Sequence, residues 1–119
     1  MNKLESSEDY LERILMLTQK NGTVRSIDIA NDMGFSKPSV SIAMKKLKAK
    51  DYIEIDDNGV ITLTAQGLAI AEYVLNKHNF LKKLLISIGV SPETAEDDAC
   101  KIEHEISDET FQRLVERFK

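Results

Sequence analysis

The sequence predicts a mainly α-helical protein with one small β-hairpin. Apolar residues recur at the three- and four-residue spacing of amphipathic helices through most of the 119 residues. Residues 34–38, GFSKP, form a short interruption between two helical patterns. Residues 51–64 change to the two-residue alternation of strands and contain the turn pair Asn58-Gly59. The predicted order is therefore helix, turn, helix and hairpin, with further helices after the hairpin.

The composition is that of a soluble globular protein, since 42% of the residues are hydrophobic and 30% are charged. No stretch approaches the roughly 20 apolar residues that span a bilayer, so we expect a cytoplasmic protein without a membrane partner. The single cysteine excludes an internal disulfide. The net charge of -4 hides a split: residues 37–50 hold five lysines and no acid, whereas residues 93–109 hold eight acids and one lysine.

The first helix is predicted to start at Ser6 or Ser7, either of which suits an N-cap, and to end near residues 21–22. Its apolar residues at helical spacing are Leu11, Ile14 and Leu15. A second, shorter helix is predicted to have Ser26 as its N-cap and to stop at Gly34, where a left-handed C-cap fits. We expect this helix to bury Ile27, Ala30 and Met33.

The third helix is predicted to follow a tight turn. Ser36 suits its N-cap, and Pro38 is tolerated only in the first turn of a helix. The residues predicted to be buried are Val40, Ala43, Met44 and Leu47. The residues left on the open face are Ser39, Ser41, Ile42, Lys45 and Lys46. This open face is small, hydroxylated and basic.

The hairpin is predicted from Ile53 and Ile55, which alternate with acidic residues, and from Asn58-Gly59, which suits the type I′ turn of a two-residue hairpin. A helix-turn-helix followed by a hairpin is the winged-helix arrangement. In that arrangement the second helix of the motif enters the major groove of DNA and the hairpin approaches the backbone. The first part of the chain is therefore predicted to be a winged helix-turn-helix.

Three more helices are predicted after the hairpin. The first runs from Thr64, as its N-cap, to about Ile88; the second follows Ser91-Pro92; and the third opens at Ser107. A boundary near Thr64 divides the chain into a winged-helix domain, residues 1–63, and a helical domain, residues 64–119. The helical domain has more apolar faces than one small core needs, so we predict that it mediates a homodimer.

The open face of the third helix is the candidate DNA-binding surface. Its serines suit phosphates or base edges and its lysines suit the DNA backbone. The candidate DNA-binding residues are Ser36, Lys37, Pro38, Ser39, Ser41, Ile42, Lys45 and Lys46. The face has no Arg, Asn or Gln for bidentate base recognition, so specificity would depend on apolar contacts and DNA shape. The alternative interpretation is a three-helix core that contacts other proteins.

A second cluster indicates a metal site. Cys100, Glu103 and His104 lie three and four residues apart, so they share one face of a helix and offer three ligands. Further donors elsewhere in the chain are Asp9, Glu12 and His78. Each residue alone has an ordinary explanation, such as a solvated helix face, first-turn acids or a buried thiol. Spacing alone leaves both interpretations open.

The chain resembles the family of the diphtheria-toxin repressor and the manganese transport regulator. The motifs that carry the resemblance are SEDYLERILML, SKPSVSIAMKKL, ITLTAQG, NKHNFLKKLL and DDACKIEHEISDE, in this order and spacing. The resemblance covers nearly the whole chain and implies a dimeric, metal-activated transcriptional repressor with a winged helix and a helical dimerisation domain. It implies the short form of the family, without the SH3-like domain that is typical of the iron branch.

The resemblance also implies a ligand set. The positions that match the metal ligands of the manganese branch are Asp9, Glu12, His78, Cys100, Glu103 and His104. Cys100 departs from that branch, which has Glu there, and matches the primary site of the iron branch. The ancillary site of the iron branch is not matched, because Lys82 and Glu96 stand where it has Glu and His. Lys82 would place a cation close to any metal bound through His78.

We therefore predict a non-enzymatic repressor that binds double-stranded operator DNA as a homodimer when Fe(II) or Mn(II) joins its two domains. The thiolate favours Fe(II), Co(II), Ni(II) or Zn(II), while Mn(II) prefers carboxylate and imidazole, so Co(II), Ni(II) or Zn(II) could bind in vitro. No catalytic residue and no small-molecule substrate are expected, since the chain lacks an H-E-x-x-H helix and paired E-x-x-H motifs. The alternative is a metal-independent winged-helix regulator that responds to another ligand.

Overall fold

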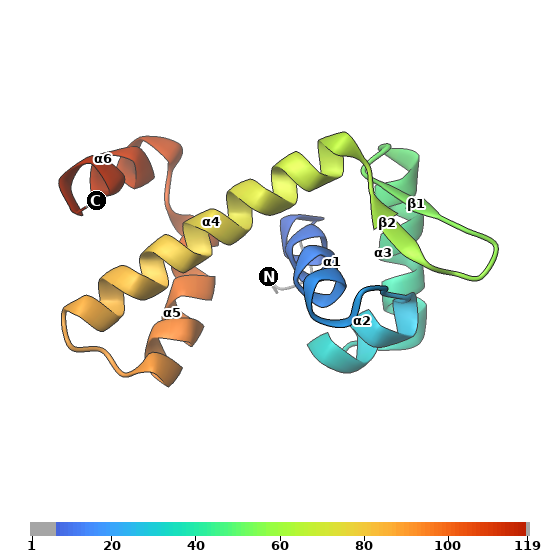
Figure 1. Ribbon diagram of the computed structural model, residues 1–119, viewed down its shortest axis with the longest axis horizontal. Coiled ribbons are helices and arrows are strands. Elements are labelled where there is room, and N and C mark those ends of the chain that lie inside the picture. Colours follow the sequence, from blue (N-terminus) through green and yellow to red (C-terminus); the bar gives the residue numbers. More distant parts are fainter. Residues whose placement is uncertain (1–6, 119) are drawn as a thin grey trace. The chain divides into compact units, whose positions relative to one another are not determined.

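The protein, described from a computed structural model over residues 7–118, has six helices and one two-stranded antiparallel sheet in that range (Figure 1). It divides into two compact units, one up to Glu72 and one from Tyr73 onward. The division falls inside the long helix α4, Ala65–Ser87, so this helix contributes to both units. The domain boundary near Thr64 stays a prediction. Within the described range, no helix has the length and apolar character needed to cross a membrane.

The first unit is a winged helix-turn-helix, as the sequence predicts. It contains α1, Ser7–Asn21; α2, Ser26–Met33; α3, Lys37–Ala49; β1, Ile53–Ile55; and β2, Ile61–Leu63. Helix α2 packs against α1 and α3, while β1 contacts α3 and β2 contacts α1. The strands pair with Ile53 opposite Leu63 and Ile55 opposite Ile61.

Helix α3 has the start and the buried face that its sequence predicts. Ser36 is its N-cap, and the Ser36 hydroxyl accepts a hydrogen bond of 3.3 Å from the backbone N–H of Ser39. Val40, Met44 and Leu47 are buried in the core of the first unit. Ala43, which we also predict to be buried, is partly exposed.

Helix α2 differs from its prediction in its N-cap and in its buried face, where Met33 is partly exposed. Ser26 is its first helical residue and Arg25 is the N-cap, because the Asp28 carboxylate accepts a 2.9 Å hydrogen bond from the Arg25 backbone N–H. Ile27 is 37% exposed, whereas Ile29 is fully buried. In an α-helix residues 27 and 29 point in nearly opposite directions, so only one of them can face the core.

The hairpin turn also differs from its prediction. A type I′ turn needs a positive φ at both central residues, but of the Asn58-Gly59 pair only Gly59 has one, at 82°. The Asp56 backbone N–H donates to the Val60 carbonyl at 3.1 Å, so three residues form the loop. The Asp56 carboxylate accepts from the N–H groups of Asn58 and Val60 and stabilises this wider turn. The prediction of a two-residue turn is therefore wrong.

The start of α4 is tied to the hairpin by close backbone packing. Thr64 caps the helix, since its hydroxyl accepts from the Gly67 N–H at 3.1 Å, and its own N–H donates to the Tyr52 carbonyl at 3.0 Å. A Cβ at position 67 would overlap the Tyr52 carbonyl oxygen. Glycine is therefore required here for close approach, and the contact fixes α4 against the segment that precedes β1.

The second unit contains the rest of α4 with α5, Pro92–Glu105, and α6, Asp108–Phe118. Ser91 caps α5 with Pro92 in its first turn, and Ser107 caps α6 through a 3.1 Å hydrogen bond from the Thr110 N–H. The buried apolar residues of this unit are Val74, Leu81, Ala95, Ala99 and Phe111. Phe111 packs edge-on against Tyr73 and Phe80, which fixes α6 on α4.

Substituting Gly67 should destabilise the first unit despite the higher helix propensity of alanine. Gly67→Ala should lower the free energy of unfolding by roughly 1–3 kcal/mol, because the new methyl group meets backbone atoms of Tyr52. In an unobstructed helix the same change would stabilise by about 1 kcal/mol. Urea denaturation of the two proteins measures the sign. The neighbouring exposed Gln66→Ala should leave stability unchanged or slightly raised; a stabilised Gly67→Ala variant would contradict the contact.

Candidate metal centre and nucleic-acid interface

The second unit holds an acidic side chain in its core. Glu103 on α5 is 1% exposed, and among the described residues its Oε2 has no hydrogen-bond partner. A buried carboxylate without full compensation is costly, so such groups are normally paired or coordinate a metal. Glu103 is therefore at the centre of the candidate metal site.

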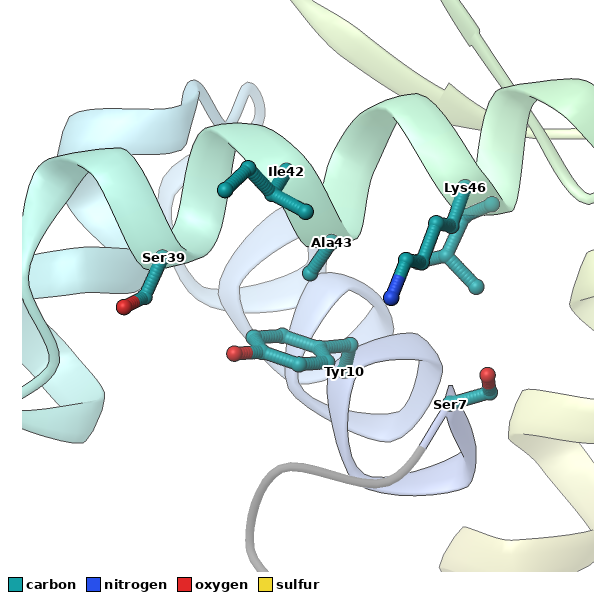
Figure 2. A pocket seen from close by; sticks show the side chains of 7 residues that line it. Ser7, Tyr10, Ser39, Ile42, Ala43 and Lys46 are labelled. Carbon is teal, nitrogen blue, oxygen red and sulfur yellow. The ribbon is translucent and has the colours of Figure 1, made fainter.

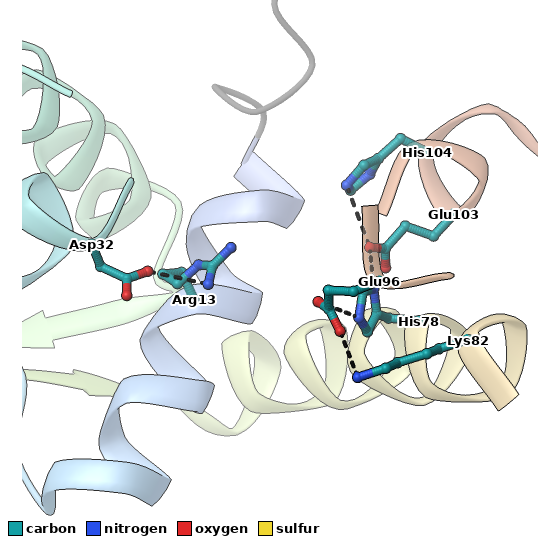
Figure 3. A network of polar contacts seen from close by, with 7 residues as sticks. All are labelled: Arg13, Asp32, His78, Lys82, Glu96, Glu103 and His104. Carbon is teal, nitrogen blue, oxygen red and sulfur yellow. Dashed lines mark hydrogen bonds and ion pairs between the residues drawn. The ribbon is translucent and has the colours of Figure 1, made fainter. Parts of the chain in front are cut away.

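His78 of α4 bonds to this carboxylate. Its Nδ1 lies 3.1 Å from Glu103 Oε1 and its Nε2 lies 2.9 Å from Glu96 Oε2, as Figure 3 shows. The hydrogen bond to Glu103 raises the pKa of His78 from 6.5 to about 9, against the burial of the ring, which lowers it; Glu96 raises it further. Without metal, both ring nitrogens of His78 are thus protonated at neutral pH and donate to the two carboxylates.

Both carboxylate oxygens of Glu96 are bonded to residues of α4. Its Oε1 lies 2.9 Å from Lys82 Nζ, while its Oε2 accepts from His78. Burial alone would raise the pKa of Glu96, but the hydrogen bonds from Lys82 and His78 outweigh it and lower that pKa below its ordinary value. Because i and i+4 share a helix face, Lys82 reaches from α4 to the carboxylate that also bonds His78.

His104 and Cys100 lie one turn apart on α5, both partly exposed. His104 Nε2 is 3.9 Å from Glu103 Oε1 (Figure 3). The structure therefore brings together three of the predicted ligands, His78, Glu103 and His104, within one unit. Cys100 is a thiol rather than part of a disulfide, on the same helix and one turn from His104.

The other two predicted ligands belong to the first unit. Asp9 and Glu12 lie on α1, three residues apart, and both are buried. Residues three apart share one helix face, so their carboxylates can act together. The assignment of all six residues as metal ligands stays a prediction.

One polar residue of the site was not identified from the sequence. Lys77 is 5% exposed; its ammonium donates to the Glu103 backbone carbonyl at 3.1 Å and lies 5.0 Å from the centre of the Tyr73 ring. The signal that the sequence offered was its i, i+4 relation to Leu81, which is buried on the same face of α4. Lys77 places positive charge beside the C-terminal turn of α5, where the helix dipole favours cations.

The donors of the second unit fit a divalent transition metal. Two imidazoles, a carboxylate and a thiol supply the nitrogen, oxygen and sulfur ligands that Fe(II), Co(II), Ni(II) and Zn(II) accept. The unpartnered Oε2 of Glu103 supplies a ready negative ligand atom in the core. Coordination through His78 requires one ring nitrogen to give up its proton and its carboxylate partner.

The predicted DNA-binding residues form one exposed surface in the first unit. All eight are exposed, and Ile42 is 56% exposed. The Ser36 hydroxyl donates to the Ser39 hydroxyl at 2.8 Å, which fixes both groups at the start of α3. A helix N-terminus with hydroxyl groups favours phosphate, and the lysines farther along α3 add positive charge.

A hollow of about 330 Å³ lies beside this surface, between α3 and the start of α1. In Figure 2, Ser39 and Lys46 extend from α3 toward the side on which Tyr10 and Ser7 of α1 lie. The hollow gives the basic face of α3 a concave border lined by hydroxyl groups. Its lining residues show that α1 contributes to the same surface.

A winged helix with a basic face and a helical unit with buried nitrogen and oxygen donors are typical of a metal-dependent DNA-binding regulator. Residues 4–59 match the N-terminal DNA binding domain of iron dependent repressors, and residues 64–119 match their metal binding and dimerisation domain. The chain belongs to the iron dependent repressor family.

Individual relatives agree with this assignment. An uncharacterized HTH-type transcriptional regulator of Methanocaldococcus jannaschii is 36% identical, over 97% of this chain and 96% of that protein. The transcriptional regulator MntR of Escherichia coli is 35% identical, over 92% of this chain and 71% of MntR. The structure of the manganese regulator SloR is 28% identical, with a TM-score of 0.82 over 95% of this chain. The chain spans about half of that structure, 53% of its length.

The lysines of α3 should contribute to DNA affinity through phosphates rather than bases. Lys45→Ala and Lys46→Ala should each weaken binding about equally on all DNA sequences. Each phosphate contact that is lost should reduce the slope of log affinity against log salt by about 0.9. Fluorescence anisotropy over a salt series measures this slope. Lys83→Ala, an exposed lysine of the second unit, should leave the slope unchanged; equal slopes in all variants would remove α3 from the interface.

Proposed function

We propose that the protein is a metal-dependent transcriptional repressor that binds operator DNA as a homodimer, with Fe(II) or Mn(II) as its metal. The observation that carries the proposal is the buried Glu103 carboxylate with its unpartnered Oε2, beside His78 and His104. The matches to a DNA binding domain and to a metal binding and dimerisation domain support it. Such a repressor would act on chromosomal DNA in the cytoplasm.

The proposed ligand set takes donors from both units. It comprises Asp9 and Glu12 on α1 with His78, Cys100, Glu103 and His104 on α4 and α5. A bound divalent ion would offset the carboxylate charges and hold donors of the two units in one coordination sphere. Without the ion, no divalent cation offsets the negative charges of the three carboxylates in this set, those of Asp9, Glu12 and Glu103.

The donor types are compatible with either Fe(II) or Mn(II). A thiolate at Cys100 favours Fe(II) over Mn(II), whereas the three carboxylates and two imidazoles suit Mn(II). The similarity to the manganese regulator SloR adds support for Mn(II). The family name, iron dependent repressor, adds support for Fe(II).

The residues of the first unit have a separate role in the proposal. The face of α3 binds phosphates and base edges whether or not the metal is present. The metal-binding donors on α1 restrict the positions that this face can take in a dimer. Two half-sites on operator DNA require a defined spacing between two recognition helices, so such a restriction raises affinity.

The test is DNA binding with and without metal. Fluorescence anisotropy is measured anaerobically on DNA from upstream of the protein's own gene, first with chelator and then with Mn(II), Fe(II), Co(II) or Zn(II) at constant salt. We expect affinity to rise at least tenfold with the active metal, in the usual range of coupling between two ligands. Equal binding in chelator would favour the metal-independent regulator instead.

Glu103→Gln identifies the site responsible. The amide keeps the shape of the side chain but removes the anionic ligand, so the metal-dependent gain in DNA affinity should be lost. Asp9→Asn, in the other unit, should have the same effect. The matched control is Glu93→Gln, an exposed acid on the same helix α5, which should retain the full gain. A Glu103→Gln protein that still responds to metal would place the site elsewhere.

A further inference from the structure

Lys82 forms an ion pair with Glu96, and the same carboxylate bonds His78, one of the proposed metal ligands. We infer that the Lys82 ammonium serves as a built-in cation for Glu96, so that each chain binds one divalent ion rather than two. This inference rests on the proposed function, because it concerns how many ions the site holds. It assigns Lys82 and Glu96 a role in metal stoichiometry.

Glu96 is bonded through both oxygens of its carboxylate. Its Oε1 pairs with Lys82 Nζ at 2.9 Å and its Oε2 pairs with His78 Nε2 at 2.9 Å (Figure 3). Both oxygens are therefore occupied by donors of this chain. The single negative charge of Glu96 is matched by the single positive charge of Lys82, so the carboxylate offers a second ion neither a free oxygen nor net charge.

Glu103 provides the contrast. It bonds to His78 through Oε1, but among the described residues Oε2 has no hydrogen-bond partner although it is buried. Within the second unit, one carboxylate oxygen near His78 thus remains available and the other carboxylate is saturated.

The exposure of the pair determines how Lys82 acts. The side chains of Lys82 and Glu96 are 36% and 45% exposed, so their ion pair contributes little to folding stability. The effect of the ion pair is electrostatic, because the Lys82 ammonium repels a divalent ion that approaches the Glu96 carboxylate. Removing the charge without removing the side-chain stem should therefore change metal binding more than stability.

Without Lys82, Glu96 Oε1 loses its partner and the carboxylate loses its compensating charge, while Oε2 still accepts from His78. A free carboxylate oxygen of this kind suits Mn(II), Fe(II) or Co(II). Lys82 lies four residues after His78 on the same face of α4, so its charge is close to any ion bound through His78.

The experiment counts ions per chain in the full-length protein. Equilibrium dialysis with Mn(II) or Co(II), followed by metal analysis, is combined with calorimetric titration. The wild-type protein should bind one ion per chain. Lys82→Met should gain a second ion, with its affinity raised by roughly tenfold or more over any second binding to the wild type. Adding Glu96→Gln to Lys82→Met should return the protein to one ion.

Two controls keep the result specific. Lys83→Met, the same change at the next, exposed position, should bind one ion. The Co(II) absorption of the first ion, including thiolate charge transfer from Cys100, should be unchanged in Lys82→Met, which separates a gained site from an altered one. Lys82→Gln serves as a second variant, and circular dichroism checks the fold of each protein.

The outcomes distinguish this inference from the proposed function. Two ions on the wild-type chain, or no difference between Lys82→Met and Lys83→Met, would overturn the role of Lys82 while leaving a metal-dependent repressor intact. A wild-type protein that binds no ion at all would overturn the proposed function, and the inference with it.

Discussion

The buried carboxylate of Glu103 is the constraint on which the second unit depends. Placing a charged group in a core costs free energy unless cations or donors compensate it. His78 supplies one donor from α4, and Lys77 places an ammonium on the backbone carbonyl of the same residue. Helix α4 thus provides positive groups on the face that meets α5. His78 compensates the carboxylate of Glu103, and Lys77 bonds its backbone carbonyl.

The face of α5 that carries Glu103 is otherwise formed by small residues. The buried positions of α5 before Glu103 are Ala95 and Ala99. The side chains of His78 and Lys77 extend from α4 to Glu96 and Glu103 on α5 and bond them there. Ala95, Ala99 and Glu103 are spaced four residues apart, so one face of α5 carries both the small packing residues and the buried acid.

Local signals in the sequence predict the elements well, because caps and prolines act within one turn. Ser36, Ser91 and Ser107 begin helices where their spacing predicts. The three-residue hairpin loop and the exposure of Ile27 were not predicted, since both depend on contacts of the folded unit. Likewise, spacing on α5 identified Cys100, Glu103 and His104, but the pairing of Glu96 with Lys82 joins two helices and has no local signal.

The division of the chain inside α4 explains why a ligand set shared by two units could act as a switch. If the metal-free protein populates the DNA-binding arrangement in about one molecule in a hundred, shifting it to ninety-nine in a hundred requires about 5.5 kcal/mol of differential binding. Under the proposed function, donors of the second unit alone would bind an ion equally in either arrangement, and such binding would shift nothing. In the proposed site, only Asp9 and Glu12 distinguish the two arrangements, so these carboxylates must supply that difference.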